Sequence, residues 1–338
     1  MSSKLLSIII PTYNRGRYLE KLLGHLLMEI RGLERHVNIF VANNCSTDNT
    51  AEVVAIYAAK SAIIKVLNRG CNVGPDENFA ACVESDTSEY FWLLGDDDLP
   101  RAGLIAGLVE ILDTRSPDLV CMRDVWMTDI YGKKEETPIG KLNVLTLDAI
   151  NYARVVNARM TFMSVTIIKR KSCFEVISVS DLRRYFNSNL IHLGWILPVL
   201  NSTNNFLYIQ NESIYATAGN TGGYSAIKVF LKNFPEIVDA ELGVNNQLSK
   251  AIKVRSMLRV VISIGWALRN GTAGNFSIEE SRRSITVDAI GWGAYVLISC
   301  IINSSILIAY PFRMVLSVIY MAIKHADIVR AKLYSALN

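Results

Sequence analysis

The chain has 338 residues, of which 51% are hydrophobic, and its formal net charge at pH 7 is +4. This length allows two domains, or one large α/β domain with an appendage. The charge is too small to indicate nucleic-acid binding, so we expect no nucleic-acid partner. Six scattered cysteines without a C-x-x-C pair argue against a zinc site or a disulfide framework and suit a reducing compartment. The first fifteen residues predict a strand rather than a signal peptide.

Strands and helices alternate over the first 125 residues. Residues 5–10 form a continuous apolar run, as expected for a strand covered on both faces, and residues 37–42, 62–67, 89–94 and 118–123 also read as strands. Segments with helical periodicity or capping residues lie between them, at 18–27, 46–60, 72–85 and 101–114. Such alternation predicts right-handed crossovers and a mostly parallel sheet with helices on both faces.

Polar residues follow three of these predicted strands. Pro11-Thr12-Tyr13-Asn14 follows the first, Asn43-Asn44 the second, and Asp96-Asp97-Asp98 the fourth. In open parallel sheets, ligands bind outside the carboxyl ends of the strands. We therefore expect these three clusters to converge on one edge of the sheet.

The three adjacent aspartates have two interpretations. Carboxylates side by side repel each other, and burying them is unfavourable unless another group compensates the charge. The segment could be a solvated turn or a helix N-terminus, since Leu99-Pro100 can open a helix. It could also bind a divalent cation, because carboxylate oxygens suit Mg²⁺ or Mn²⁺. The convergence of polar clusters favours the cation site.

Four motifs together resemble a known family. SIIIPTYNR, NNCSTDNT, NVGPDENF and LLGDDDLP resemble, in order and spacing, the nucleotide-binding half of family 2 glycosyltransferases with the GT-A fold. The resemblance covers residues 4–125 well and residues 126–220 loosely. Its details look most like transferases that add deoxy sugars to bacterial O-antigen units, such as abequosyl- or rhamnosyltransferases.

The resemblance implies a nucleotide-sugar donor, a divalent metal (Mn or Mg) on its diphosphate, and inversion at the anomeric carbon. A metal held by aspartate can neutralise the charge that develops on the leaving nucleoside diphosphate. Asp97 falls on the metal-binding position, with Asp96 and Asp98 as neighbours in contact with ribose, water or the metal ligands. Gly95 replaces the first aspartate of the usual D-x-D pattern, so the alignment can shift by one residue.

The remaining donor contacts come from the other clusters. The resemblance implies donor binding by Pro11, Thr12, Tyr13 and Asn14, by Asn43, and by Asn78. Many members have aspartate where Asn43 stands. An amide can accept or donate, so a UDP-, dTDP- or CDP-sugar remains open. Alternatively, Asn43-Asn44 only forms an Asx turn and Asn78 is an ordinary helix residue.

The general base departs from the family pattern, because the usual Glu-Asp pair beyond the metal motif is missing. His192 occupies about the expected place, and its ordinary pKa lies near the working pH. Asp181 is the alternative base, although its segment also looks like a helix N-terminus. His192 could equally be a buried structural histidine.

The C-terminal part reads differently. From about residue 228 the strand pattern stops, and residues 289–312 contain no charged residue. This run is long enough to cross a bilayer, and a basic amphipathic tail follows it. We predict a GT-A domain over 1–225, with a nucleotide-sugar half (1–125) and an acceptor half (126–225). A helical region, 226–338, would associate with the cytoplasmic side of the inner membrane, either as a span or at the surface; a soluble helical cap is the alternative.

Three functions compete. The first is an inverting, metal-dependent glycosyltransferase that acts on a lipid-linked glycan acceptor in surface polysaccharide or O-antigen biosynthesis. The second is a catalytically inactive nucleotide-binding scaffold in a glycan assembly complex, supported by the missing Glu-Asp pair. The third, a dinucleotide-dependent oxidoreductase, is weak because no G-x-G-x-x-G follows the first strand.

Overall fold

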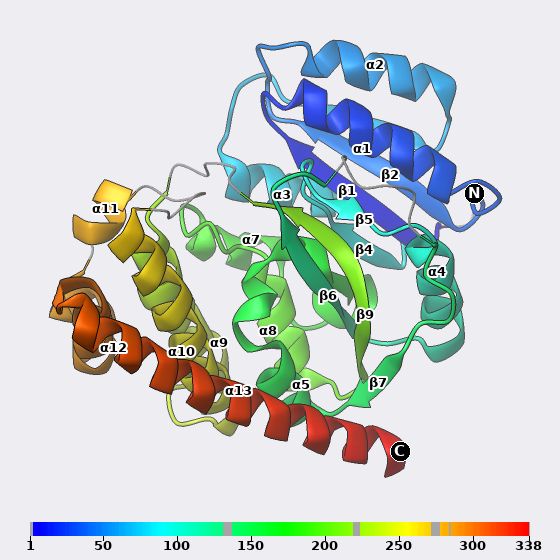
Figure 1. Cartoon of the computed structure of the whole chain (residues 1–338). Coiled ribbons are helices and arrows are strands. Elements are labelled where there is room, and N and C mark those ends of the chain that lie inside the picture. Colours follow the sequence, from blue (N-terminus) through cyan, green and yellow to red (C-terminus); the bar gives the residue numbers. More distant parts are fainter. Residues whose placement is uncertain (1–2, 131–136, 219–223, 272–277, 284, 338) are drawn as a thin grey trace. The chain divides into compact units, whose positions relative to one another are not determined.

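The computed structural model describes residues 3–130, 137–218, 224–271, 278–283 and 285–337 (Figure 1). The chain forms two compact units. The first comprises residues 1–145 and 162–217, and the second comprises residues 146–161 and 218–338. Residues 146–161 thus fall in the second unit, whereas they were predicted in the acceptor half (126–225) of the first domain.

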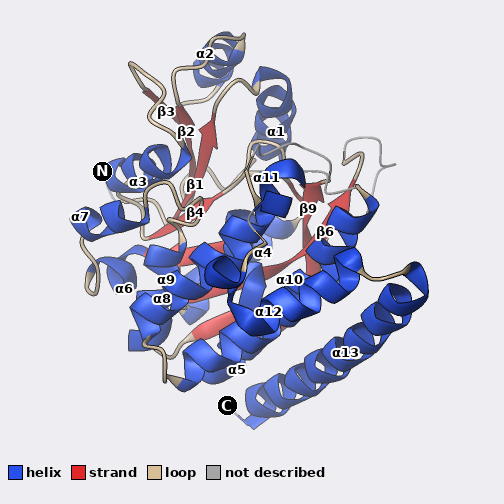
Figure 2. Ribbon diagram, turned by 90° about the vertical axis from the view of Figure 1, so that its left-hand side faces the viewer, coloured by secondary structure: helices blue, strands red, loops and turns tan. Residues whose placement is uncertain are grey.

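Four parallel strands form one half of the sheet in the first unit, in the spatial order β3-β2-β1-β4 (Figure 2). They are β1 (Leu6–Thr12), β2 (Val37–Asn43), β3 (Ile64–Asn68) and β4 (Tyr90–Leu93). Every residue of β1, β2 and β4 is buried, as continuous apolar runs require when helices cover both faces. The predicted α/β class is confirmed, and the predicted mostly parallel sheet is found in this half.

The other half of the sheet is mixed. β8 (Thr166–Lys169) runs antiparallel to both β4 and β6 (Leu119–Met127). β9 (Phe206–Thr217) runs parallel to β6, and the short β5 (Leu99–Pro100) pairs antiparallel with β9. β7 (Val144–Leu147) lies where the chain passes from the first unit to the second. The sheet therefore joins segments that are far apart in sequence.

The helices of the first unit connect these strands. The four long ones after the strands are α1 (Gly16–Glu29), α2 (Thr50–Lys60), α3 (Pro75–Ser85) and α4 (Leu104–Arg115). Later come η2 (Met163–Val165), α6 (Arg170–Phe174), α7 (Val179–Leu182), η3 (Arg183–Tyr185) and α8 (Leu193–Ser202). In α1, Leu19, Leu22 and Leu26 are fully buried at helical spacing, so the predicted amphipathic helix is confirmed.

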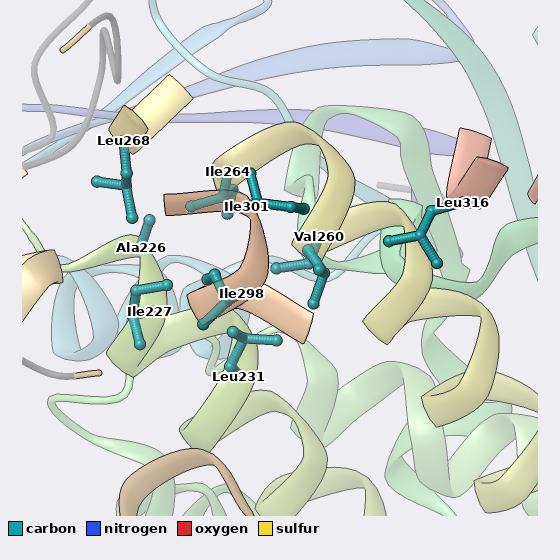
Figure 3. Packing of buried hydrophobic residues seen from close by; sticks show 10 residues of the cluster. Ala226, Ile227, Leu231, Val260, Ile264, Leu268, Ile298, Ile301 and Leu316 are labelled. Atoms are coloured by element: carbon teal, nitrogen blue, oxygen red, sulfur yellow. The ribbon is translucent and has the colours of Figure 1, made fainter. Parts of the chain in front are cut away.

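The second unit is helical. It contains α5 (Ala149–Val156), η1 (Asn157–Thr161), the π-helix η4 (Lys228–Asn233), α9 (Phe234–Leu242), α10 (Gln247–Asn270), α11 (Ile278–Arg283), α12 (Val287–Asn303) and α13 (Ile306–Leu337). Figure 3 shows its core, where Val260 and Ile264 of α10 pack with Ile298 of α12 and with Leu231 of η4. α5 and η1 pack on α10, which is why residues 146–161 belong to this unit.

The uncharged run at 289–312 does not form one helix. α12 ends at Asn303 and α13 begins at Ile306, so the run is divided between two helices. Ile298 and Ile301, in the middle of the run, are fully buried in the core of the second unit. Among the described residues, α13 is the helix long and apolar enough to cross a membrane by length and composition, with a mean hydropathy of 1.9 in its best window.

Candidate functional site

The carboxyl ends of the parallel strands form one row. Thr12 at the end of β1 is in register with Asn43 at the end of β2, and Asn43 is in register with Asn68 of β3. The Thr12 hydroxyl donates a hydrogen bond of 2.6 Å to Oδ2 of Asp96, just beyond the end of β4. The expected convergence of the polar clusters is therefore confirmed for the ends of β1, β2 and β4.

The three aspartates lie in a tight turn that begins at Gly95. The Asp98 N–H donates to the Gly95 carbonyl at 3.2 Å, and the Gly95 N–H donates to Oγ of Ser164 at 2.9 Å. The Ser164 hydroxyl in turn donates to Oδ2 of Asp98 at 2.5 Å. A Cβ at Gly95 would lie 2.6 Å from that same Oδ2. Gly95 is therefore required by the close approach of the Asp98 carboxylate, which explains the departure from D-x-D.

The three carboxyl groups differ in their exposure to solvent. Asp96 and Asp98 are 9% and 5% exposed, whereas the Asp97 side chain is 22% exposed. Burial, with Asp97 beside it, raises the pKa of Asp96 to about 7, and the same two causes raise the pKa of Asp98 well above its ordinary value. Asp97 is thus the most accessible carboxylate of the turn, flanked by two acidic groups that a nearby cation would stabilise in their charged form.

The residues present fit a divalent metal that is shared with a ligand. Within the described ranges, no group of three or more His, Cys, Asp or Glu side chains could hold a metal ion by itself. Mg²⁺ is commonly held by one or two carboxylates together with substrate phosphates and water. Asp97 can provide such a carboxylate, and the Thr217 hydroxyl holds its backbone by donating to the Asp97 carbonyl. A site completed by a diphosphate is consistent with this donor set.

Arg15 is a candidate site residue that was not predicted from the sequence. Its guanidinium Nη1 lies 3.5 Å from Oδ2 of Asp97, and the Arg15 side chain is 29% exposed. Arg15 directly precedes α1 and follows Asn14, whose φ of 54° turns the chain at the end of β1. A guanidinium beside an accessible carboxylate can bind phosphate oxygens. Its place in the SIIIPTYNR motif is the sequence feature that could have identified it.

The other residues of the first cluster have different surroundings. Pro11 is buried within β1, and the Tyr13 side chain is 41% exposed. Oδ1 of Asn14 accepts from the Thr47 N–H at 2.8 Å, and the Asn14 N–H donates to Oγ of Ser46 at 2.9 Å. Asn14 therefore joins the loop after β1 to the loop after β2.

The asparagines of the second cluster make internal hydrogen bonds. Oδ1 of Asn43 accepts from the Ser46 N–H at 3.0 Å, while its Nδ2 donates to Oδ1 of Asn68 at 3.2 Å. Oδ1 of Asn44 accepts from the Val73 N–H at 3.1 Å. These bonds are those of a loop-stabilising pair, the alternative role for Asn43-Asn44. Asn43 still lies at the row of strand ends, one strand away from Thr12.

Asn78 lies within the fold beneath this row. Its side chain is 2% exposed on α3, and its Nδ2 donates to the Ala42 carbonyl at 3.2 Å. Ala42 immediately precedes Asn43, so Asn78 supports the end of β2 from behind. An ordinary exposed helix residue, the alternative considered for Asn78, does not describe this position.

The candidate bases occupy contrasting environments. His192 directly precedes α8 and is 4% exposed. Asp181 is exposed in a capping box, where its Oδ2 accepts from the Ser178 N–H and hydroxyl. The hydrogen bond from the Ser178 side chain is the largest reason why the pKa of Asp181 is lowered. The two side chains therefore do not share one polar cluster.

Asp76 links the donor motif NVGPDENF to the segment before His192. Its carboxylate is 3% exposed and accepts from the N–H groups of Asn189, at 3.1 Å, and Ile191, at 3.4 Å. The backbone turns there with a φ of 66° at Asn187 and 61° at Asn189. Burial raises the pKa of Asp76 in spite of these bonds. Asp76 was not predicted as a site residue, and it positions the residues that lead into α8.

Comparison with known proteins agrees with this geometry. Residues 7–154 match the model of glycosyl transferase family 2. This part of the chain is similar to that family, and it makes up less than half of the 338 residues. Abequosyltransferase RfbV of Salmonella typhimurium is 33% identical over 120 residues, which are 35% of this chain and 36% of that protein. Glycosyltransferase GlyG of Streptococcus pneumoniae is 24% identical over 118 residues, 35% of this chain and 38% of that protein. The alignments thus span little more than a third of either relative.

Solved structures extend the likeness in fold to nearly the whole chain. Residues 1–349 of TarS from S. aureus superpose with a TM-score of 0.57 at 17% identity, covering 95% of this chain and 90% of that one. A mannosyltransferase from Pyrobaculum calidifontis, solved with GDP-Man and Mn²⁺, gives a TM-score of 0.54 at 14% identity, covering 98% and 88%. The chain therefore shares the GT-A-like fold of these structures.

Proposed function

We propose that the protein is an inverting, metal-dependent glycosyltransferase that moves a sugar from a nucleotide-sugar donor to a glycan acceptor. The observation that carries this proposal is the accessible Asp97 carboxylate between two buried acidic groups, 3.5 Å from the Arg15 guanidinium. A leaving nucleoside diphosphate gains negative charge as the glycosidic bond breaks. Asp97 would hold the metal, and Arg15 would bind phosphate oxygens, so both would stabilise that charge.

The donor and acceptor follow from the same reasoning. Asn43 would face the base, and its amide is compatible with a UDP-, dTDP- or CDP-sugar. The abequosyltransferase relative supports a deoxy sugar and an acceptor of O-antigen or lipopolysaccharide biosynthesis. Such an acceptor would be lipid-linked, and the apolar C-terminal helix supports a location at the cytoplasmic face of the inner membrane.

The acceptor hydroxyl must lose a proton, and we propose His192 as the base with Asp181 as the alternative. A neutral imidazole suits this role near neutral pH. Because His192 is 4% exposed, the residues that cover its ring would have to move before an acceptor reaches it. Asp181 is accessible, but its lowered pKa makes it a weaker base.

The test compares Asp97→Asn with Asp113→Asn, which changes an exposed aspartate of α4. Candidate nucleotide sugars are incubated with the purified protein and Mn²⁺, and both donor hydrolysis and the donor-induced rise in Tm are measured. An amide is a poorer, uncharged ligand for a hard cation, so Asp97→Asn should abolish turnover and the Mn²⁺-dependent rise in Tm. Asp113→Asn should behave as the wild type. Full turnover by Asp97→Asn would contradict the assignment, and binding without turnover by the wild type would indicate the inactive scaffold.

A further inference from the structure

The outward face of α13 is apolar over most of the helix. Six exposed apolar residues recur at spacings of three, four, seven or eight, which keeps them on one side of the helix: Leu307, Met314, Val318, Met321, Val329 and Leu333. His325 and Lys332 lie on the same side by this spacing, and the exposed Val315 and Ile319 flank it. Val318 is 64% exposed and Leu333 is 61% exposed. A soluble amphipathic helix presents the opposite pattern, with its polar side chains outward.

Two charged residues of α13 make contacts on its inward face. Oδ1 and Oδ2 of Asp327 accept from the Arg255 guanidinium of α10 at 2.9 Å and 2.5 Å, and Asp327 is 3% exposed. The Arg313 guanidinium lies 4.5 Å from the centre of the Trp266 ring, also on α10. Between these two contacts, Leu316 packs into the core of the second unit (Figure 3). The inward face is thus fastened to α10 along three turns or more.

This attachment argues against a transmembrane role. The length and hydropathy of α13 are sufficient for a span. To cross a bilayer, however, the helix would have to leave α10, which would separate Asp327 from Arg255. Each partner of this buried ion pair would then lose the charge that compensates it, which disfavours the separated arrangement. If the contacts between α13 and α10 are kept, only the outward face of α13 can meet a membrane.

The exposed charges of α13 favour one occupant of that face. The helix has one acidic residue, the buried Asp327, and its exposed charged side chains include Lys324, Arg330 and Lys332. In a two-fold pairing with a second copy, these basic side chains would face the same basic surface and repel. An anionic bilayer attracts them and also accepts the apolar side chains.

We propose that α13 lies in the plane of an anionic phospholipid surface, with its outward face inserted and its inward face kept on α10. Tyr310, which is 51% exposed on the same helix, would lie at the headgroup level. This arrangement rests on the proposed function in one respect, because its purpose would be to hold the protein beside a lipid-linked acceptor. It involves α13 of the second unit and no residue of the donor site.

The first test measures binding of the full chain to vesicles of phosphatidylcholine alone and of phosphatidylcholine with about one third phosphatidylglycerol. Val318→Asp is compared with Val244→Asp, because Val244 is 61% exposed in the same unit but lies outside α13. We expect the wild type to prefer anionic vesicles and Val318→Asp to bind at least about tenfold more weakly, since an apolar contact is lost and a repelled charge is gained. Val244→Asp should bind as the wild type.

Two further measurements make the inference falsifiable. Met321→Asp should repeat the loss, and both variants should keep the wild-type Tm because both sites are exposed. A protease-cleavable tag after Asn338 should be removed from vesicle-bound protein by protease added outside. A protected tag would mean that α13 spans the membrane and would overturn the inference. Equal binding by Val318→Asp and Val244→Asp would overturn it as well.

A second copy as the occupant gives a different result. Sedimentation equilibrium without vesicles would then show a wild-type dimer that Val318→Asp converts to a monomer, together with no vesicle binding, and the inference would be wrong. The vesicle assay contains no nucleotide sugar. Loss of vesicle binding with donor turnover intact would therefore refute this inference alone, and loss of turnover with binding intact would refute the proposed function alone.

Discussion

Gly95→Ala is expected to disturb the acidic turn through a single contact. The new Cβ would lie 2.6 Å from Oδ2 of Asp98 and 3.3 Å from Oδ1 of Asp97. Ordinary contacts begin near 3.4 Å, so the Asp98 carboxylate would have to retreat by roughly 0.8 Å in a closely packed interior. That movement breaks its 2.5 Å hydrogen bond from Ser164.

The magnitude follows from what is lost. Leaving a buried hydrogen-bonding group without its partner costs about 1–3 kcal/mol, and Asp98 is too buried for water to replace the Ser164 hydroxyl freely. For a domain of this size, each kcal/mol lowers Tm by about 2–4 °C, so Gly95→Ala should lower Tm by about 2–12 °C. The Mn²⁺-dependent stabilisation by a donor should fall as well, since Asp97 lies in the same turn.

Gly70→Ala is the matched control, because a Cβ at Gly70 meets no atom within 4 Å. It should change the free energy of unfolding by less than about 0.5 kcal/mol. Thermal unfolding of both variants, with and without Mn²⁺ and donor, gives the comparison. In the double variant Gly95→Ala/Asp98→Ala the steric conflict is absent, so its destabilisation should be smaller than the sum of the single effects. Equal Tm values for Gly95→Ala and Gly70→Ala would refute the reasoning.

Three further predictions concern other parts of the first unit. Burial is the main reason why the pKa of His25 lies below 6.5, and the ring is 2.7 Å from the Pro100 carbonyl, so the unfolded chain takes up the proton first. Stability should therefore fall as pH falls below 6.5, and His25→Gln should flatten this dependence in urea titrations. Asp76→Ala should cost about 2–4 kcal/mol by urea unfolding, because two backbone N–H groups lose their acceptor; a change below 1 kcal/mol would contradict this. If His192 is the base, His192→Ala should reduce transfer by roughly 10²–10⁴-fold with donor affinity unchanged, and Asp181→Asn should not; the reverse result would move the role to Asp181.

Local patterns in the sequence were sufficient for the first half of the sheet. Strands covered on both faces need largely apolar sequences, and β1, β2 and β4 have them, each with polar residues at or shortly after its end. Parallel strands place those ends together, so the meeting of Thr12 with Asp96 could be expected. The carboxylate cluster itself was visible because three adjacent aspartates are unusual beside a buried strand.

Only the tertiary structure could decide what surrounds that cluster. Ser164 and Thr217 reach the turn from segments about seventy and 120 residues further along the chain. Their own neighbours in sequence carry no signal of this, because β8 and β9 find their partners by packing. The distinction between accessible Asp97 and its two buried neighbours depends on these contacts, and so does the exposure of the candidate bases.

For the C-terminal helix, too, the sequence predicted the composition and the tertiary structure decided the orientation. Composition identified an apolar region with a basic tail, which any membrane-seeking or buried helix would share. Whether its apolar side chains point inward or outward depends on which side packs against α10. A mean hydropathy over a window does not tell which side of the helix the apolar residues occupy, whereas the Arg255–Asp327 ion pair fixes the rotation of α13 about its axis. With that rotation, Val318 and the other apolar residues on its side of the helix are exposed, because side chains on opposite sides of a helix point in opposite directions.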